Sequence, residues 1–307
     1  MLGMRFTAFV YRALGRALCS LLLYPIVAYF YLTDRAGRRS ARRYLARVAR
    51  AGAPESALGR PGPARHPFRL YREFGIALLD HVGFCLGRSS DFAVEIRGME
   101  HLDKLARDGR GGLVLGAHLG SFAAMRLIAQ ERSPIAVNVL MYTRHAARIN
   151  SVLLRLSKHS GALGAVRVIP IEVDSLSHVL MARSAVQRGE VVAVLADRLH
   201  PHDVQRASAV ELLGGCVELP AGPVLLGRAL GCPVVTMFAL RSGNARYTIH
   251  VDPFAERIAL PRDGREAAIH AYCQQYAQRL ERYCRLAPYQ WFNFYDYWSE
   301  EAPRAAR

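Results

Sequence analysis

The sequence has few cysteines, and none of them is spaced for a metal site. Its six cysteines are scattered along the chain without a Cys-x2-Cys pair, which argues against the common zinc-binding arrangements. Scattered cysteines also give no disulfide framework, so a reducing compartment is expected. We interpret them as small buried hydrophobic residues. No metal site is therefore expected at the cysteines. We also predict no metal and no cofactor for the chain as a whole.

Acidic residues are scarce as well. The chain has 25 Asp and Glu against 41 Lys and Arg, and a formal net charge of +16. Such a charge favours a polyanionic neighbour, either nucleic acid or an anionic membrane. No zinc-finger spacing, RNP-like motif or basic zipper is present. The basic stretch 35–72 directly follows the most apolar stretch, and anionic headgroups attract such residues by about 1 kcal/mol each. We predict an anionic membrane as partner and no nucleic acid.

The longest run without charge covers residues 17–33. It is slightly short for a straight bilayer crossing of about 20 residues, and its tyrosines suit a membrane interface. Basic residues are more numerous after the run, which predicts that the rest of the chain is cytoplasmic. The alternative is a buried amphipathic helix of a soluble domain. We divide the chain into a membrane-associated helix (1–35), a basic helical segment and linker (36–90) and an α/β domain (91–307).

After this linker, strand-like and helix-like runs alternate. This pattern predicts an α/β fold with a mostly parallel sheet flanked by helices. The expected strands are 92–97, 113–115, 135–141, 166–169, 191–195, 233–240 and 247–251. The expected helices are 38–48, 68–86, 99–107, 122–130, 146–158, 176–188, 223–230 and 266–284. A segment rich in proline and glycine, 51–67, is expected to be a loop.

One histidine stands where a predicted strand gives way to a predicted helix. The stretch 111–126 passes from an apolar run through small residues and His118 into a helix-like run. Neutral imidazole is the usual general base near neutral pH, and neighbouring glycines leave room for a substrate. The alternative is a histidine whose ring is satisfied by backbone groups in a Gly-rich turn.

Three further segments follow predicted strands, where sites gather in open α/β sheets. They are 142–145 with Arg144, 196–198 with Asp197 and Arg198, and 213–223 with Gly214 and Gly215. Each has a simpler reading. Arg144 fits a surface charge, Asp197 a turn cap, the Gly-Gly pair a hairpin turn, and 220–223 a helix start. A helix start also offers N–H groups to phosphate.

The segment around His118 resembles the His-x4-Asp/Glu motif of membrane-bound glycerolipid acyltransferases. It is most similar to the late acyltransferases of lipid A biosynthesis, where the form is roughly Ala-His-x-Gly-x-(aromatic)-Glu. His118, Gly120 and Phe122 fit this form. Further resemblances are carried by 142–144, 188–198, 219–223 and 288–296. The Phe-Asn-Phe-Tyr-Asp form of the last segment is similar to the branch associated with aryl-polyene pathways.

This resemblance implies a glycerolipid acyltransferase-like fold at the bacterial inner membrane, with the catalytic domain facing the cytoplasm. The acyl donor would be an acyl carrier protein or acyl-CoA thioester, and the acceptor a lipid hydroxyl. His118 would act as general base, and Arg144 would bind a phosphate. Gly120, Asp197 and Arg198 are the other expected substrate-binding positions. A non-catalytic lipid-binding or scaffold protein of the same fold is the alternative.

Ala123 departs from the family pattern because it stands where the acid is expected. Without that carboxylate the imidazole is expected to lose the group that sets its tautomer. The analogous loss costs a serine protease triad about 10⁴ in rate. We favour an engineered Glu→Ala substitution over a natural variant that recruits another acid or has lost catalysis. On that interpretation, Ala123→Glu should raise acyl transfer by orders of magnitude.

Overall fold

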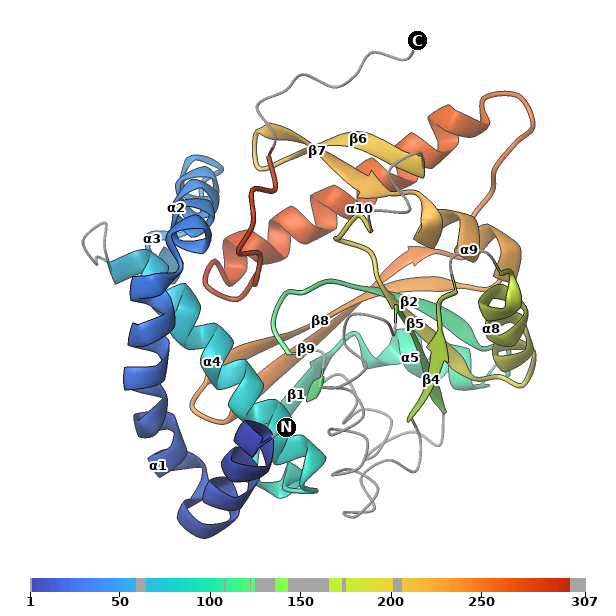
Figure 1. Ribbon diagram of the computed structural model, residues 1–307. Helices are drawn as coiled ribbons and strands as arrows, with labels where there is room; N and C mark the ends of the chain where they lie inside the picture. The colour runs from blue at the N-terminus through green and yellow to red at the C-terminus, as the bar shows by residue number, and fades with distance from the viewer. Residues whose placement is uncertain are drawn as a thin grey trace.

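The computed structural model describes residues 2–58, 65–107, 109–121, 123–124, 136–142, 166–172, 175–200 and 206–298. At its centre is a seven-stranded sheet in the order β1-β9-β8-β2-β5-β3-β4 (Figure 1). The strands are β1 (Ala93–Arg97), β2 (Gly112–Gly116), β3 (Val137–Met141), β4 (Val166–Pro170), β5 (Val191–Leu195), β8 (Val234–Gly243) and β9 (Arg246–Ala255). Only β8 and β9 pair antiparallel in this sheet. The predicted mostly parallel α/β sheet is confirmed.

The two faces of the sheet carry separate apolar cores. Every residue of β2 is buried, as expected for a central strand covered on both faces. Leu113 and Leu115 point into one core, and Val114 points into the other. The first core is closed by α8 (Ser177–Gln187), α9 (Gly222–Leu230) and α10 (Arg265–Leu286), and the second by α5 (Met99–Arg107).

A two-stranded antiparallel hairpin, β6 (Ala207–Leu212) and β7 (Gly215–Pro220), packs on α10. The sequence did not predict these strands, although it did suggest a hairpin turn at Gly214 and Gly215, which is confirmed. The suggested helix start is also confirmed, since α9 begins at Gly222. Cys216 on β7 is exposed, so the expectation of burial is wrong there. It is confirmed for the other cysteines.

Four helices precede the sheet: α1 (Leu2–Thr33), α2 (Arg35–Arg50), α3 (Glu55–Leu58) and α4 (Arg65–Cys85). Helix α1 is longer than predicted and has a break at Gly15, where φ is 71°. Asp34 caps α2 by accepting from Gly37 N at 2.8 Å and also accepts from Tyr71 of α4 at 2.7 Å. Helix α3 lies in the segment predicted to be a loop.

Helix α1 presents one face to α4 and another to solvent. Its buried residues include Tyr11, Cys19 and Val27. Its exposed large apolar residues are Phe9, Leu18, Leu21, Leu22, Tyr24, Ile26, Tyr29, Phe30 and Leu32. Among the described residues, the stretch Gly15–Thr33 alone is long and apolar enough to cross a membrane. A single such helix near the N-terminus weakly supports membrane association.

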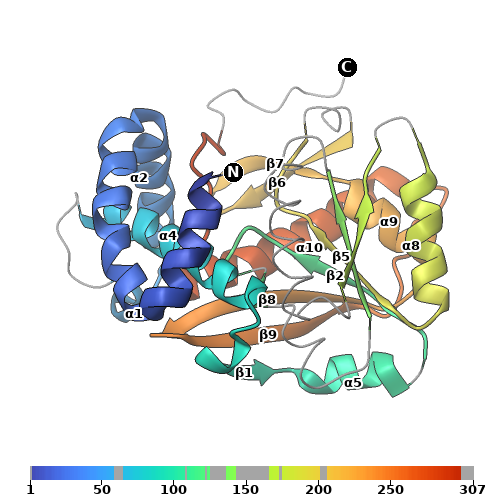
Figure 2. The same cartoon turned by 60° about the horizontal axis from the view of Figure 1, so that its bottom comes forward.

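The helices α1, α2 and α4 gather at one end of the sheet, opposite α8 and α9 (Figure 2). Helices α1 and α4 are connected to the strand ends beside the β8–β9 turn through two buried carboxylates of α4. Asp80 of α4 accepts from Arg16 Nε at 2.7 Å and from Tyr247 OH at 2.6 Å. Glu73 accepts from Arg241 Nε at 2.9 Å. Because β8 and β2 run parallel, α1 and α4 lie toward the edge at which β2 ends.

The other predicted elements agree with the structure to within a few residues at each end. The predicted helix 146–158, and all but two residues of the predicted helix 122–130, fall outside the described residues. The division of the chain at residues 35 and 90 stays a prediction.

Candidate active site

His118 lies in the turn that follows β2, at the carboxyl edge of the sheet. Its carbonyl accepts a hydrogen bond from Phe292 N at 2.9 Å. Two residues further on, Gly120 N donates to Gln290 O at 2.8 Å. Both partners belong to the segment that follows α10. The C-terminal segment therefore fixes the backbone from which the imidazole projects, and the side chain of His118 remains 32% exposed.

Gly120 is required by the backbone at its position. Its φ is +73°, a value that favours glycine. A Cβ there would lie 2.0 Å from Ala239 O of β8, whereas the next residue, Ser121, uses that same carbonyl for a hydrogen bond of 2.8 Å. The structure thus brings Gly120 beside His118, as predicted. Its expected role in substrate binding stays a prediction.

The imidazole of His118 contacts a fully buried carboxylate. Asp197 Oδ1 lies 2.9 Å from His118 Nδ1, and the Asp197 side chain is 0% exposed. The second oxygen, Oδ2, accepts from the backbone N of His118 at 3.0 Å. It also accepts from Trp291 Nε1 at 2.9 Å. One carboxylate therefore holds both the backbone and the ring of the histidine.

This contact assigns the histidine tautomer. An ionised carboxylate only accepts hydrogen bonds, so Nδ1 of His118 donates, and in the neutral ring Nε2 keeps a lone pair. Burial alone would raise the pKa of Asp197, but the contacts with His118 and the Trp291 indole outweigh it and hold the pKa below its ordinary value. The pair is therefore arranged as a base with a fixed, negatively charged support.

The sheet topology brings these two residues together. Strands β2 and β5 are parallel neighbours, and their register pairs Gly116 with Leu195. Ala196 N then donates to Gly116 O at 2.9 Å. His118 and Asp197 each lie two positions beyond this last pair, so their side chains meet at the carboxyl edge.

The expectation that Ala123 leaves His118 without a carboxylate partner is wrong. The carboxylate of Asp197, which is distant in sequence, contacts the His118 ring. Ala123 itself is buried at 3% exposure in an apolar cluster that also contains Ala124, Met237 and Ala239. Position 123 therefore supplies no acid to His118 in this chain, and its expected catalytic role stays a prediction.

Arg198, directly after the aspartate, is held by the C-terminal segment. Its Nε donates to Asn293 Oδ1 at 3.0 Å, and its Nη2 donates to Phe292 O at 2.8 Å. Its guanidinium carbon lies 5.6 Å from the centre of the Tyr295 ring. The side chain is exposed, so an anchored guanidinium faces solvent beside the His118–Asp197 pair. Its expected role in substrate binding stays a prediction.

The sequence reasoning assigned no site role to Trp291, Asn293 or Gln290. They lie in an irregular segment that was noted above only because it resembles a family motif. The side chains of this segment close the site. Gln290 bonds both backbone groups of Arg241 at 2.8 Å. Trp291 is completely buried and packs edge-on against Tyr44 of α2 at 5.2 Å. The signal that could have found them is the run of aromatic and amide residues itself.

The remaining predicted segments are placed elsewhere or not at all. Segment 213–223 forms the hairpin turn, β7 and the start of α9, and the hairpin touches the C-terminal segment where Trp298 Nε1 donates to Leu212 O at 3.0 Å. Arg144 lies outside the described residues.

Comparison with known proteins supports the predicted family. A family model described as bacterial lipid A biosynthesis acyltransferase matches residues 71–300, more than half of the chain. This range contains the sheet, His118, Asp197 and the C-terminal segment. Residues 1–70, with α1 and α2, lie outside it. No curated protein matches the chain.

Proposed function

The chain belongs to the bacterial lipid A biosynthesis acyltransferase family, and we propose that it moves an acyl chain from a thioester donor to a lipid hydroxyl. The donor is an acyl carrier protein or acyl-CoA. His118 is the general base, and Asp197 is its supporting acid. The single observation that carries this proposal is the 2.9 Å contact between His118 Nδ1 and the buried Asp197 carboxylate.

The proposed reaction uses the free nitrogen of His118. Nε2 takes the proton of the acceptor hydroxyl while that oxygen attacks the thioester carbonyl carbon. The tetrahedral intermediate collapses with cleavage of the C–S bond, and the leaving thiolate takes the proton back from the imidazolium. The ester and the free thiol leave, and His118 returns to its neutral form. Asp197 stabilises the imidazolium that exists between these two steps.

Two arginines are proposed to recognise phosphate groups. A guanidinium suits phosphate because its donors form a rigid fork. The hydrogen bonds of Arg198 to Asn293 and Phe292 reduce the ordering needed on binding. Arg144 is proposed for the same chemistry on the basis of the resemblance. We propose that these two arginines bind a phosphate group of the acyl donor or of the lipid acceptor.

We further propose that the chain is active as it stands. Of the explanations for Ala123, the contact with Asp197 supports a natural variant that draws its acid from another strand. A Glu side chain at position 123 would add a charge to an apolar cluster. The resemblance of the C-terminal segment to the aryl-polyene branch supports a polyene or fatty acyl chain as the transferred group.

The proposed location is the bacterial inner membrane, with the catalytic domain on the cytoplasmic side. Support comes from the exposed apolar face of α1, from the basic helix α2 that follows it, and from the position of both near the carboxyl edge of the sheet. A lipid acceptor held in the membrane would then reach His118 from the side of α1.

Charged residues on the apolar face of α1 are expected to release the chain from membranes. Leu22→Asp with Phe30→Asp should lower binding to phosphatidylglycerol vesicles at least tenfold, because both side chains are exposed and a buried charge is costly in lipid. Vesicle flotation measures this. The matched control is Leu176→Asp with Leu180→Asp, which alters exposed apolar residues at the N-cap and in the first turn of α8. Equal losses in both variants would contradict a specific role for α1.

A non-catalytic scaffold that binds lipid is the second hypothesis, since the same fold and apolar helix would serve it. The two hypotheses differ in their chemical product. Lipid extracts from cells with and without the chain should differ by an added acyl chain if the chain is an acyltransferase. Mass spectrometry detects this difference, and a scaffold would produce none.

A further inference from the structure

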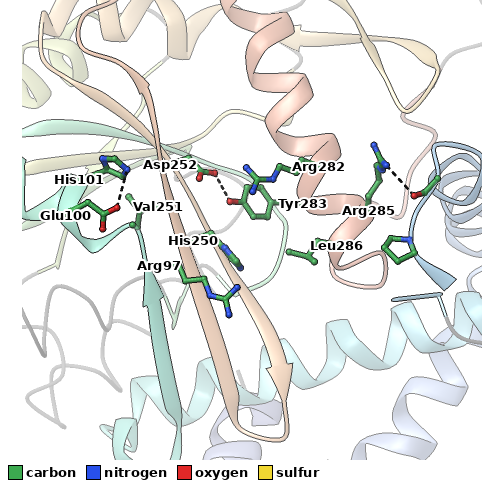
Figure 3. Close-up of a pocket in the computed structure, with 13 residues that line it drawn as sticks. Arg97, Glu100, His101, His250, Val251, Asp252, Arg282, Tyr283, Arg285 and Leu286 are labelled. Atoms are coloured by element: carbon green, nitrogen blue, oxygen red, sulfur yellow. Dashed lines mark hydrogen bonds and ion pairs between the residues drawn. The ribbon is translucent and has the colours of Figure 1, made fainter. Parts of the chain in front are cut away.

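A pocket of about 680 Å³ lies between α10 and the β1–β9 edge of the sheet (Figure 3). Four parts of the fold line it: the segment after α2, the end of β1 with the start of α5, the middle of β9, and the last turns of α10. Its volume is typical of sites for small ligands. None of its lining residues belongs to the His118–Asp197 site.

Basic side chains converge on this pocket from three different elements. Arg97 comes from β1, His250 from β9, and Arg282 and Arg285 from α10. Burial lowers the pKa of His250, the charge of Arg97 lowers it further, and Arg282 adds to this effect, while Asp252 and Glu95 act in the opposite direction. Both guanidinium groups and both carboxylates therefore act on the same ring. This convergence distinguishes the pocket from the generally basic surface of a chain with this charge.

Two acidic residues also line the pocket and contact neighbouring side chains. Asp252 accepts from Tyr283 OH at 2.6 Å, and Glu100 lies 3.8 Å from His101 Nε2. Outside the lining, Glu95 accepts from Arg97 Nε at 2.8 Å. That last bond uses one donor of the Arg97 fork and leaves its Nη groups for another acceptor.

The rest of the pocket wall is less polar. Pro54, Val251 and Leu286 line it together with the Tyr283 ring, and Leu286 is 52% exposed. Arg285 Nη2 donates to Gly52 O at 3.3 Å, which connects α10 to the segment after α2 at this end. The pocket therefore combines a cationic part with a partly apolar end.

We propose that this pocket binds the phosphate group of a small phosphorylated ligand. Arg97 and Arg282 hold the phosphate, and His250 is a third donor. Paired guanidinium forks are the usual protein ligands for such a dianion, and the apolar end receives the organic part. The phosphate belongs to a soluble ester or to a lipid headgroup. The proposal does not depend on the catalytic role of His118.

Calorimetric titration of the full chain in detergent tests this site. The probes are inorganic phosphate, glycerol 3-phosphate and dihexanoyl phosphatidic acid, each added without a thioester donor. Saturable binding of at least one probe is expected. Arg97→Gln with Arg282→Gln should weaken it at least tenfold. Arg265→Gln, which removes an exposed charge at the start of α10, should leave the affinity unchanged.

The different probes distinguish the two possible sources of the phosphate. Binding of glycerol 3-phosphate indicates a soluble ester, and binding of phosphatidic acid alone indicates a headgroup. Thermal unfolding shows whether the double variant is folded, and Arg282→Gln alone gives a milder second test with a loss of at least threefold. The proposal is overturned if the unsubstituted chain binds no probe saturably, or if the folded double variant binds with equal affinity.

Discussion

Asp197→Asn is expected to lower the rate of acyl transfer about 10³- to 10⁴-fold with little change in KM. The reason lies in the contacts of the carboxylate. Two donors, His118 N and Trp291 Nε1, converge on Oδ2, so an amide at this position must keep its oxygen there. Its NH₂ group then faces Nδ1 of His118, which has to accept. The ring proton moves to Nε2, and the base is lost.

A steady-state assay with an acyl carrier thioester measures this effect. The matched control is Asp80→Asn, because Asp80 is also fully buried and hydrogen-bonded but lies on α4. Both variants lose charge-assisted hydrogen bonds of about 1.5–3 kcal/mol each, so both should be less stable. Only Asp197→Asn should lose the chemistry. A folded Asp197→Asn chain with a rate within tenfold of the unsubstituted chain would rule out the proposed support of His118.

His118→Ala is expected to lower the rate by about 10⁴ or more, because it removes the group that takes the hydroxyl proton. Thioester and lipid binding should remain, since the turn around position 118 is held by backbone hydrogen bonds to Phe292 and Gln290. A single-turnover assay with a labelled acyl donor separates loss of chemistry from loss of binding.

The control for this variant is His270→Ala, which alters an exposed histidine on α10. Its rate should match that of the unsubstituted chain. The enzyme hypothesis fails if the His118→Ala chain still transfers the acyl group at the original rate. A chain that binds lipid but transfers no acyl group, with or without His118, would be the proposed scaffold.

Most of the sheet and the place of His118 could be predicted from the sequence. The buried strands are short, continuous apolar runs, which local patterning identifies. Because the carboxyl ends of parallel strands share one edge, the residues after each run were already candidates for a site. His118 and Asp197 were both found in this way. The strands β6 and β7 were missed, because their apolar runs are short and interrupted by Glu211 and Glu218.

The pairing of His118 with Asp197 could not be predicted, because it depends on strand order. The two residues are 79 positions apart, and β3 and β4 intervene in the chain. Only the adjacency of β2 and β5 brings them together. A motif read along the chain places the acid at position 123. In the structure, the carboxylate that contacts His118 instead follows a neighbouring strand, β5.

The role of the C-terminal segment was also hidden from the sequence. Residues 290–298 form no regular helix or strand, so no periodicity marks which side chains are buried. Their contacts run to the turn after β2, to β8 and to α2, all distant in sequence. Trp291 contributes to the site only because this segment folds back over the carboxyl edge.

In the proposed mechanism, Asp197 supplies the acid that supports His118, and position 123 does not. The most direct test is to measure the acyl-transfer rates of the unsubstituted, Ala123→Glu and Asp197→Asn chains side by side with one thioester donor. We predict an active unsubstituted chain, no gain from Ala123→Glu, and a loss of at least about 10³-fold from Asp197→Asn. An inactive unsubstituted chain that gains orders of magnitude from Ala123→Glu would contradict the account.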